Sequence, residues 1–119
     1  MEEITKYWNS YYDFKNHNNK PSNFALFINK KYINKDTVLL DVGSGDGRDA
    51  FYFNKKAKYV VGIDKSNVVI KKNKLKAKKL NLKKINFKNI SSNKLIKIKN
   101  IKINFIYARF FFACNKRKK

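Results

Sequence analysis

The feature that most constrains the fold is a glycine-rich turn that directly follows a short apolar run. Residues 37–42 form a nearly continuous apolar stretch, and Gly43, Gly45 and Gly47 follow it at alternate positions. Glycine tolerates positive φ and lets the backbone approach a ligand, and the helix expected at 47–56 offers free N–H groups at its start. This order predicts a buried parallel strand, a ligand-binding turn for a carboxylate or phosphate, and a helix.

A second apolar stretch ends in an acidic residue. Residues 59–63 predict another buried parallel strand, and Asp64 follows them. A carboxylate at this point can accept hydrogen bonds from both ribose hydroxyls of a nucleoside. The nicotinamide dinucleotide fingerprint G-x-G-x-x-G is incomplete, because the sixth position counted from Gly43 is Arg48. The pattern therefore favours a nucleoside ligand and weakens the nicotinamide interpretation.

Hydrophobic spacing predicts two helices before the first strand. Residues 4–12 carry apolar side chains along one helical face, and Ser22 can cap a second helix after Pro21. We expect both aromatic faces to pack into the core. The face of the second helix consists of Phe24, Phe27, Ile28 and Tyr32.

Further elements alternate along the rest of the chain. A helix is predicted from Ser66 to Leu80, and strands are predicted at 85–89 and 101–107. Strands that alternate with helices indicate right-handed βαβ units in an α/β domain. The exposed polar stripe of the long helix is expected to be Asn67, Lys71, Lys74 and Lys78.

Composition narrows the function classes. A chain of 119 residues has room for one domain, and Cys114, its only cysteine, can form no intramolecular disulfide. The first residues lack the pattern of a signal peptide, so we expect a cytoplasmic protein without a membrane span. His17 is the only histidine and is expected to be a solvated loop residue, which excludes a Ser-His-Asp triad.

The net charge of +21 is distributed unevenly. Lys, Asn and Ile together make up 55 residues, and all three have A/T-rich codons, so mutational bias accounts for much of the basic composition. All eight acidic residues lie at or before Asp64, so the second half carries the positive field. Nucleic-acid binding through the lysine stripe is therefore an alternative, but composition does not favour it.

Residues 38–49 resemble the first motif of class I S-adenosylmethionine-dependent methyltransferases, and residues 60–66 resemble their second. The segment 21–25, Pro-Ser-Asn-Phe-Ala, is similar to an element of small bacterial members. The resemblance implies a Rossmann-like parallel sheet in the order 3-2-1-4 with flanking helices. It divides the chain into N-terminal aromatic helices (1–35), a βαβ core (36–109) and a basic tail (110–119).

The resemblance also assigns roles. Asp41 and the glycine loop would hold the methionine part of S-adenosylmethionine, Asp64 the ribose, and Asn89 would replace the acidic residue that meets adenine in many members. The implied cofactor-binding set is Asp41, Gly43, Ser44, Gly45, Gly47, Asp64, Lys65, Asn89 and Ile90. Arg48, Tyr107 and Arg109 are candidates for the substrate or cofactor pocket. Arg48 and Asp49 either shape the cofactor pocket or form an ion pair on the helix surface. Arg109 either has a structural role or contacts a ligand, because it follows the carboxyl end of a central strand. No metal site and no dedicated catalytic base are expected, because in-line placement of the methyl acceptor can supply the catalysis.

The family fold has seven strands, of which this chain would supply four. The acceptor half would be absent, and the fourth strand would lie at an open edge that favours association. A frameshift within codons 110–112 is expected to explain the tail, since a back-translation with one T removed continues as the relatives do. Two alternatives stay open: a non-catalytic cofactor-binding half-domain that acts with a partner, and a nucleic-acid-binding module. The methyl acceptor is not identified.

Overall fold

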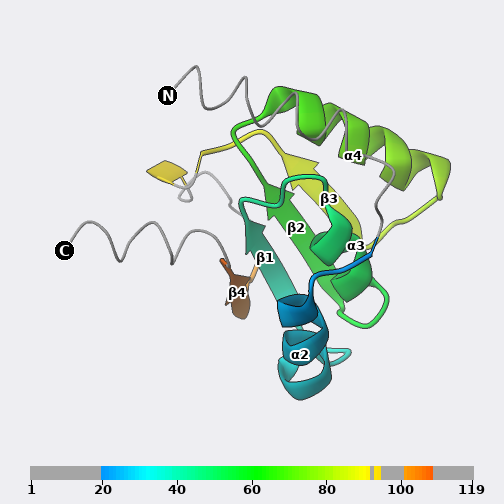
Figure 1. Cartoon of the computed structure of the whole chain (residues 1–119), viewed down its shortest axis with the longest axis vertical. Coiled ribbons are helices and arrows are strands. Elements are labelled where there is room, and N and C mark those ends of the chain that lie inside the picture. The colour runs from blue at the N-terminus through cyan, green and yellow to red at the C-terminus, as the bar shows by residue number, and fades with distance from the viewer. Residues whose placement is uncertain (1–19, 92, 95–100, 109–119) are drawn as a thin grey trace.

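The computed structural model describes residues 20–91, 93–94 and 101–108, which contain a four-stranded parallel sheet and three helices (Figure 1). The strands are β1 (Val38–Val42), β2 (Tyr59–Ile63), β3 (Ile85–Lys88) and β4 (Phe105–Tyr107). Their order across the sheet is β3-β2-β1-β4, which confirms the expected arrangement. The predicted helix at 4–12 lies outside the described residues.

Two of the three helices begin where a serine side chain caps them. Ser22 accepts a hydrogen bond from Ala25 N at the start of α2 (Asn23–Tyr32), and Ser66 accepts one from Val69 N at the start of α4 (Asn67–Lys79). The third helix, α3 (Arg48–Asn54), begins at Gly47 in the left-handed conformation. The predicted caps are thereby confirmed, and the glycine turn leads directly into α3.

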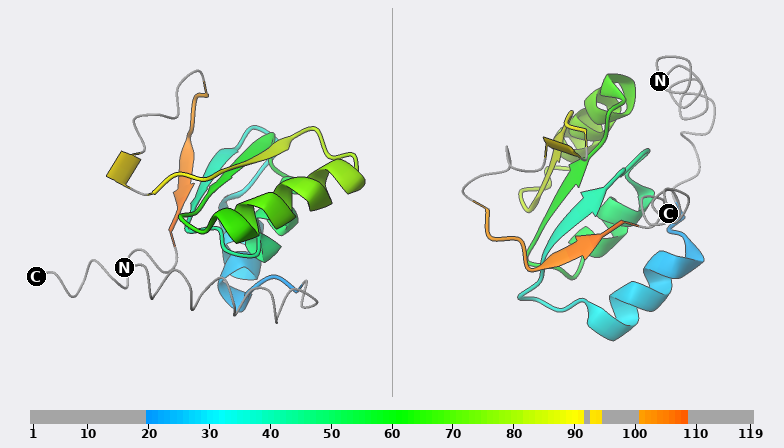
Figure 2. Two further views of the ribbon diagram at one scale, coloured as in Figure 1. Left: turned by 90° about the horizontal axis from the view of Figure 1, so that it is seen from above. Right: turned by 90° about the vertical axis from the view of Figure 1, so that its left-hand side faces the viewer.

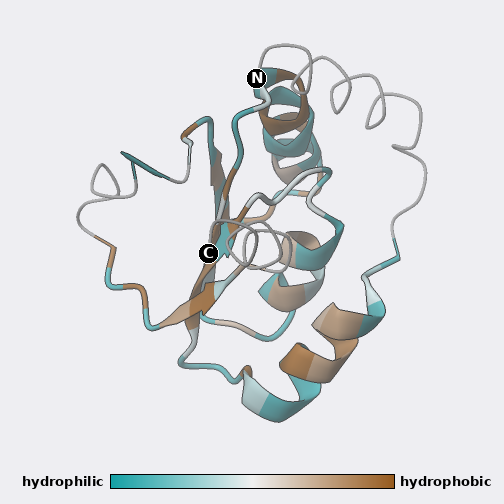
Figure 3. Cartoon of the chain, turned by 60° about the vertical axis from the view of Figure 1, so that its left-hand side comes forward, coloured by the Kyte–Doolittle hydropathy of each residue, from teal (hydrophilic) through white to brown (hydrophobic). Residues whose placement is uncertain are grey.

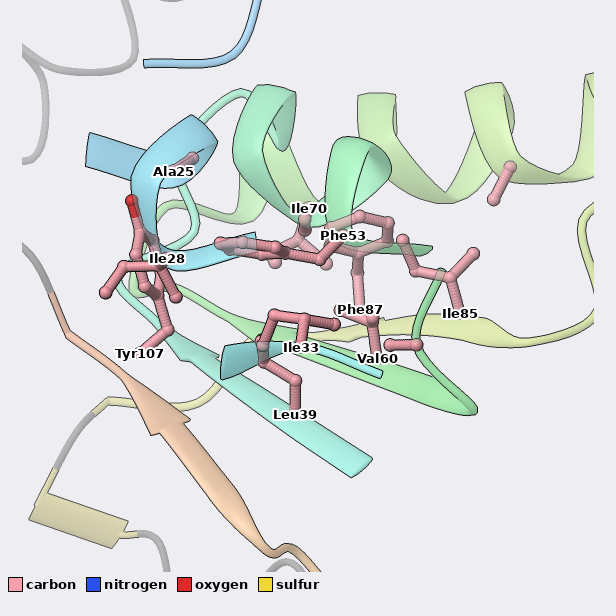
Figure 4. Packing of buried hydrophobic residues seen from close by; sticks show 13 residues of the cluster. Ala25, Ile28, Ile33, Leu39, Phe53, Val60, Ile70, Ile85, Phe87 and Tyr107 are labelled. Carbon is pink, nitrogen blue, oxygen red and sulfur yellow. The ribbon is translucent and has the colours of Figure 1, made fainter. Parts of the chain in front are cut away.

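The helices pack on one face of the sheet, as two further views show (Figure 2). Figure 4 shows the main core between them and the strands, where the large ring of Phe53 is fully buried. Burial of this apolar surface is the main term that stabilises the sheet and helices against each other. The members drawn in Figure 4 include Ala25, Ile28, Ile33, Leu39, Val60, Ile70, Ile85, Phe87 and Tyr107.

Of the face predicted for α2, Ile28 enters the core and the three aromatic rings do not. Phe24, Phe27 and Tyr32 are 45%, 52% and 49% exposed, whereas Ala25 and Ile28 are buried. In Figure 3 the first turns of α2 are mainly hydrophobic. The expectation was wrong for the three rings, which lie at the margin of the core. Phe24 stacks on Tyr107 with 5.7 Å between ring centroids, Phe27 contacts Tyr32, and Tyr32 contacts Phe105.

The fourth strand is shorter than predicted. Residues 101–104 precede β4 (Phe105–Tyr107), although burial alternates along 101–106 as expected. Asn104 attaches this segment to the start of β1: its backbone N donates to Val38 O at 3.0 Å, its Oδ1 accepts from Val38 N at 2.8 Å, and its Nδ2 donates to Asp36 O at 3.1 Å. β4 pairs with β1 and forms one edge of the described sheet.

Among the helices of the described part of the chain, none is long and apolar enough for a membrane span. The same residues contain no group of three side chains suited to hold a metal ion.

Candidate functional site

The glycine turn lies at the carboxyl ends of β1 and β2. Gly43, Gly45 and Gly47 all have positive φ, at 74°, 55° and 80°. Gly43 N and Ser44 N both donate to Ile63 O at 2.9 Å, so the turn folds over the end of β2. The carboxyl edge of a parallel sheet is where α/β proteins bind ligands, and the predicted loop occupies that position.

Asp64 connects the two strand ends. Its Oδ2 accepts a hydrogen bond from Gly45 N at 2.9 Å, and its Oδ1 accepts one from Ser66 N at 2.9 Å. The carboxylate is half-buried, and each oxygen can accept a further hydrogen bond. The glycine turn and the end of β2, which are separated in the sequence, therefore meet at the Asp64 carboxylate, and this carboxylate can accept further hydrogen bonds.

Asn89 and its neighbours follow β3 at the same edge. Asn89 Nδ2 donates to Asp64 O at 2.9 Å and to Lys65 O at 3.0 Å. Asn89 and Lys65 are exposed, whereas Ile90 is half-buried against the smaller apolar cluster of the sheet. The structure thus brings Asn89 and Lys65 beside Asp64, as the predicted set requires.

Two buried polar residues belong to the end of β1 and to the turn itself. Asp41 is 3% exposed near the end of β1, and Ser44 is 8% exposed, with an Oγ that has no hydrogen-bond partner among the described residues. Beside them, burial raises the pKa of the Asp46 carboxyl, an effect that the Arg48 backbone N–H partly offsets. A buried hydroxyl without a partner is costly, and Ser44 Oγ is covered by protein atoms on the inner side of the turn.

Ligand access differs along the turn. A Cβ added at Gly43 would meet nothing within 4 Å, whereas one at Gly47 would lie 2.9 Å from the Phe51 ring and 3.1 Å from the Asn73 side chain. The open side of Gly43 fits close approach by a ligand. Gly47 instead serves the packing of the turn against α3 and α4.

Asn73 is a site residue that the sequence analysis missed. It is 3% exposed on α4, and its Nδ2 donates to Gly45 O at 2.8 Å. A signal was present: Asn73 lies three or four positions from Val69, Ile70 and Ala77, the buried residues of α4. A polar residue within such an apolar stripe indicates a buried hydrogen bond.

Replacing Asn73 with alanine is expected to lower the free energy of unfolding by about 1–3 kcal/mol, because the buried Gly45 carbonyl loses its donor. Urea denaturation would measure the change. Asn67→Ala, at an exposed position of the same helix, is the control and should change stability by less than about 0.5 kcal/mol. Equal losses in the two variants would contradict this role for Asn73.

The three pocket candidates, Arg48, Tyr107 and Arg109, differ in where they lie. Arg48 is half-buried at the start of α3, beside Asp46. Tyr107 is 3% exposed, and its hydroxyl donates to Asp49 Oδ2 at 2.7 Å within the helix-covered core. Arg109 lies outside the described residues. The Tyr107 hydroxyl is thus engaged with α3.

Comparison with known proteins adds to this geometry. A family model described as a methyltransferase domain matches residues 33–117. No curated protein matches the sequence significantly. The family match begins after α2, so the helix that Ser22 caps lies outside it.

Solved structures share the fold. TrmK from M. capricolum, in complex with the cofactor product S-adenosyl-homocysteine, is 21% identical with a TM-score of 0.63, and the match covers 73% of this chain and 40% of TrmK. A SAM-dependent methyltransferase from Aquifex aeolicus is 26% identical with a TM-score of 0.60, over 71% of this chain and 46% of that one. A dimethyladenosine transferase from Plasmodium falciparum is 20% identical with a TM-score of 0.61, and the match covers 75% of this chain and 32% of the transferase. The chain spans less than half the length of each.

Proposed function

Because this chain belongs to the methyltransferase domain family, we propose that it binds S-adenosylmethionine at the carboxyl edge of its sheet and presents the methyl group for transfer. The observation that most supports this proposal is the hydrogen bond from Gly45 N to Asp64 Oδ2 at 2.9 Å. It unites the loop proposed for the methionine part with the carboxylate proposed for the ribose. A solved structure of similar fold contains S-adenosyl-homocysteine, which supports the choice of cofactor.

The described residues fit this cofactor. The open side of Gly43 accommodates close approach of the methionine part. Asp64 has an accepting position on each oxygen for the two ribose hydroxyls, since each oxygen receives one backbone N–H. Asp41, buried beside the loop, adds negative charge that complements the α-amino group and the sulfonium.

The residues of this chain would contribute binding and orientation. When bound, the cofactor supplies an electrophilic methyl group on a positively charged sulfur. The loop and Asp64 hold its two ends, so the direction in which the methyl group points is fixed by the protein. Placement of this kind can supply several kcal/mol of rate acceleration without a dedicated base.

Asn89 would recognise the adenine amino group through its oxygen. Both hydrogens of Nδ2 are directed to backbone carbonyls, those of Asp64 and Lys65, which fixes the orientation of the amide. Oδ1 is left as the outward acceptor. It can therefore take the role of the acidic residue in related enzymes, with a neutral hydrogen bond in place of a charged one.

We expect the chain to prefer S-adenosylhomocysteine over its 6-oxo analogue, S-inosylhomocysteine, by about two- to tenfold, the value of one neutral hydrogen bond. Asn89→Ala should abolish this preference. The matched control is Asn54→Ala, which removes a similar side-chain donor to Lys84 O at the opposite edge of the sheet. Competition binding measures the affinities for the two ligands in each variant. A preference for S-adenosylhomocysteine that survives Asn89→Ala would contradict the role of Asn89 in adenine recognition.

The methyl acceptor stays unassigned, and transfer by this chain is itself part of the proposal. A half-domain that binds the cofactor and acts with a partner would show affinity without transfer. Incubation with methyl-labelled S-adenosylmethionine and small-molecule or RNA fractions would separate the two, because only an active enzyme labels an acceptor.

A further inference from the structure

Asp49 is a buried carboxylate outside the proposed cofactor set. It is 5% exposed and lies in the first turn of α3, two positions after Gly47. A carboxylate at such depth is costly unless several donors and nearby positive potential compensate for the lost water. The hydrogen-bond partners of Asp49 therefore indicate its role in the structure.

The hydrogen bonds that reach Asp49 include three from two other elements of the described part of the chain. Ser22 N donates to Oδ1 at 2.8 Å, Ser22 Oγ donates to Oδ2 at 2.9 Å, and the Tyr107 hydroxyl donates to Oδ2 at 2.7 Å. Ser22 is the N-cap of α2, and Tyr107 ends β4. One carboxylate thus connects the start of α2, the start of α3 and the end of β4.

The surroundings of the cluster fix its geometry. The N-termini of α2 and α3 meet at Asp49, where their backbone N–H groups lie near its side chain. Burial, and to a lesser degree the hydrogen bond with Asp49, raises the pKa of Tyr107, so the phenol remains a donor throughout the physiological range. Ring contacts with Phe53 (4.8 Å between centroids) and Phe24 (5.7 Å) hold Tyr107 in place.

The turn next to this cluster needs such an anchor. Three of its five residues, 43–47, are glycines with positive φ, and glycine has more backbone freedom to lose than other residues. The sheet fixes the first end of the turn through β1. The second end is Gly47, the N-cap of α3, and its position depends on the contacts that hold the start of that helix.

We propose that Asp49, held by Ser22 and Tyr107, is a positioning residue that fixes the start of α3 and thereby orders the glycine loop for cofactor binding. The inference rests on the proposed function for its link to the cofactor. By this proposal Ser22, which lies before the residues that match the family, helps to position the cofactor site through its hydrogen bonds to Asp49. Removing the hydroxyl of Tyr107 should loosen the loop without removing any group that touches the cofactor.

The test compares Tyr107→Phe and Ser22→Ala with Thr37→Val. Thr37 is also buried, and its hydroxyl accepts from Asn34 N at 2.9 Å at the amino end of β1, away from the loop. All three changes remove a buried hydroxyl and should lower thermal stability. Amide hydrogen exchange of residues 43–48 and titration with S-adenosylhomocysteine are then measured on the full chain.

The two cluster variants should speed exchange of the loop amides and weaken S-adenosylhomocysteine binding by roughly three- to tenfold, whereas Thr37→Val should leave affinity within about twofold. Cluster variants that lose stability but keep loop exchange and affinity at the level of Thr37→Val would show a merely structural cluster and overturn the proposal. If the unaltered chain binds no S-adenosylhomocysteine, the proposed function fails, and the exchange rates alone decide whether Asp49 orders the loop.

Discussion

Replacing Asp64 with alanine is expected to weaken S-adenosylmethionine binding by roughly 10- to 150-fold. The variant loses a charged acceptor for two ribose hydroxyls, which costs about 1.5–3 kcal/mol. It also loses the acceptor for Gly45 N and Ser66 N, so the loop loses its attachment to the end of β2. Isothermal titration calorimetry on the variant and the unaltered chain measures the difference.

Asp36→Ala is the matched control for Asp64→Ala. It makes the same change in net charge, but Asp36 is exposed and lies before the amino end of β1. Its affinity should equal that of the unaltered chain, which separates loss of a contact from a general effect of charge. An Asp64→Ala variant that binds as tightly as the control would exclude Asp64 from the cofactor site.

Alanine at the two outer glycines of the turn should have opposite consequences. At Gly47, positive φ and contacts of 2.9 and 3.1 Å with Phe51 and Asn73 predict a loss of about 2–4 kcal/mol in the free energy of unfolding. At Gly43 the added methyl meets no protein atom within 4 Å, so the loss is limited to about 1–2 kcal/mol of backbone strain. Cofactor affinity should nevertheless fall more than about tenfold in Gly43→Ala, because the methyl enters the space proposed for the methionine part.

Urea denaturation and calorimetry on both glycine variants test this separation. The account requires Gly47→Ala to be the less stable of the two and Gly43→Ala to fold yet bind weakly. Gly43→Ala with unchanged affinity would show that no ligand approaches the turn from its open side.

The sequence predicted the parts of the fold that local rules determine. The β2 strand spans 59–63 as expected, and α2 and α4 begin after the serines identified as caps. Each depends on a short signal: an uninterrupted apolar run buried on both faces, or an oxygen that accepts an N–H three residues later. The order of the strands followed from the resemblance of the two motifs to a known family.

Contacts between distant segments were not predictable in the same way. The aromatic spacing of α2 suggested a buried face, but how far Phe24 and Phe27 are buried depends on the position of the helix over the sheet. Asp49 was expected either to shape the pocket or to form a surface ion pair with Arg48, and its bonds to Ser22 and Tyr107 join residues 27 and 58 positions away. Only the tertiary structure brings these groups together.

The most direct test of the account is a calorimetric titration of the unaltered chain with S-adenosylmethionine, S-adenosylhomocysteine and a nicotinamide dinucleotide. The account predicts saturable binding of the first two ligands at one site per chain and no binding of the third, because the loop and Asp64 are arranged for an adenosine joined to methionine. No binding of either sulfur-containing ligand, or tighter binding of the nicotinamide dinucleotide, would contradict it.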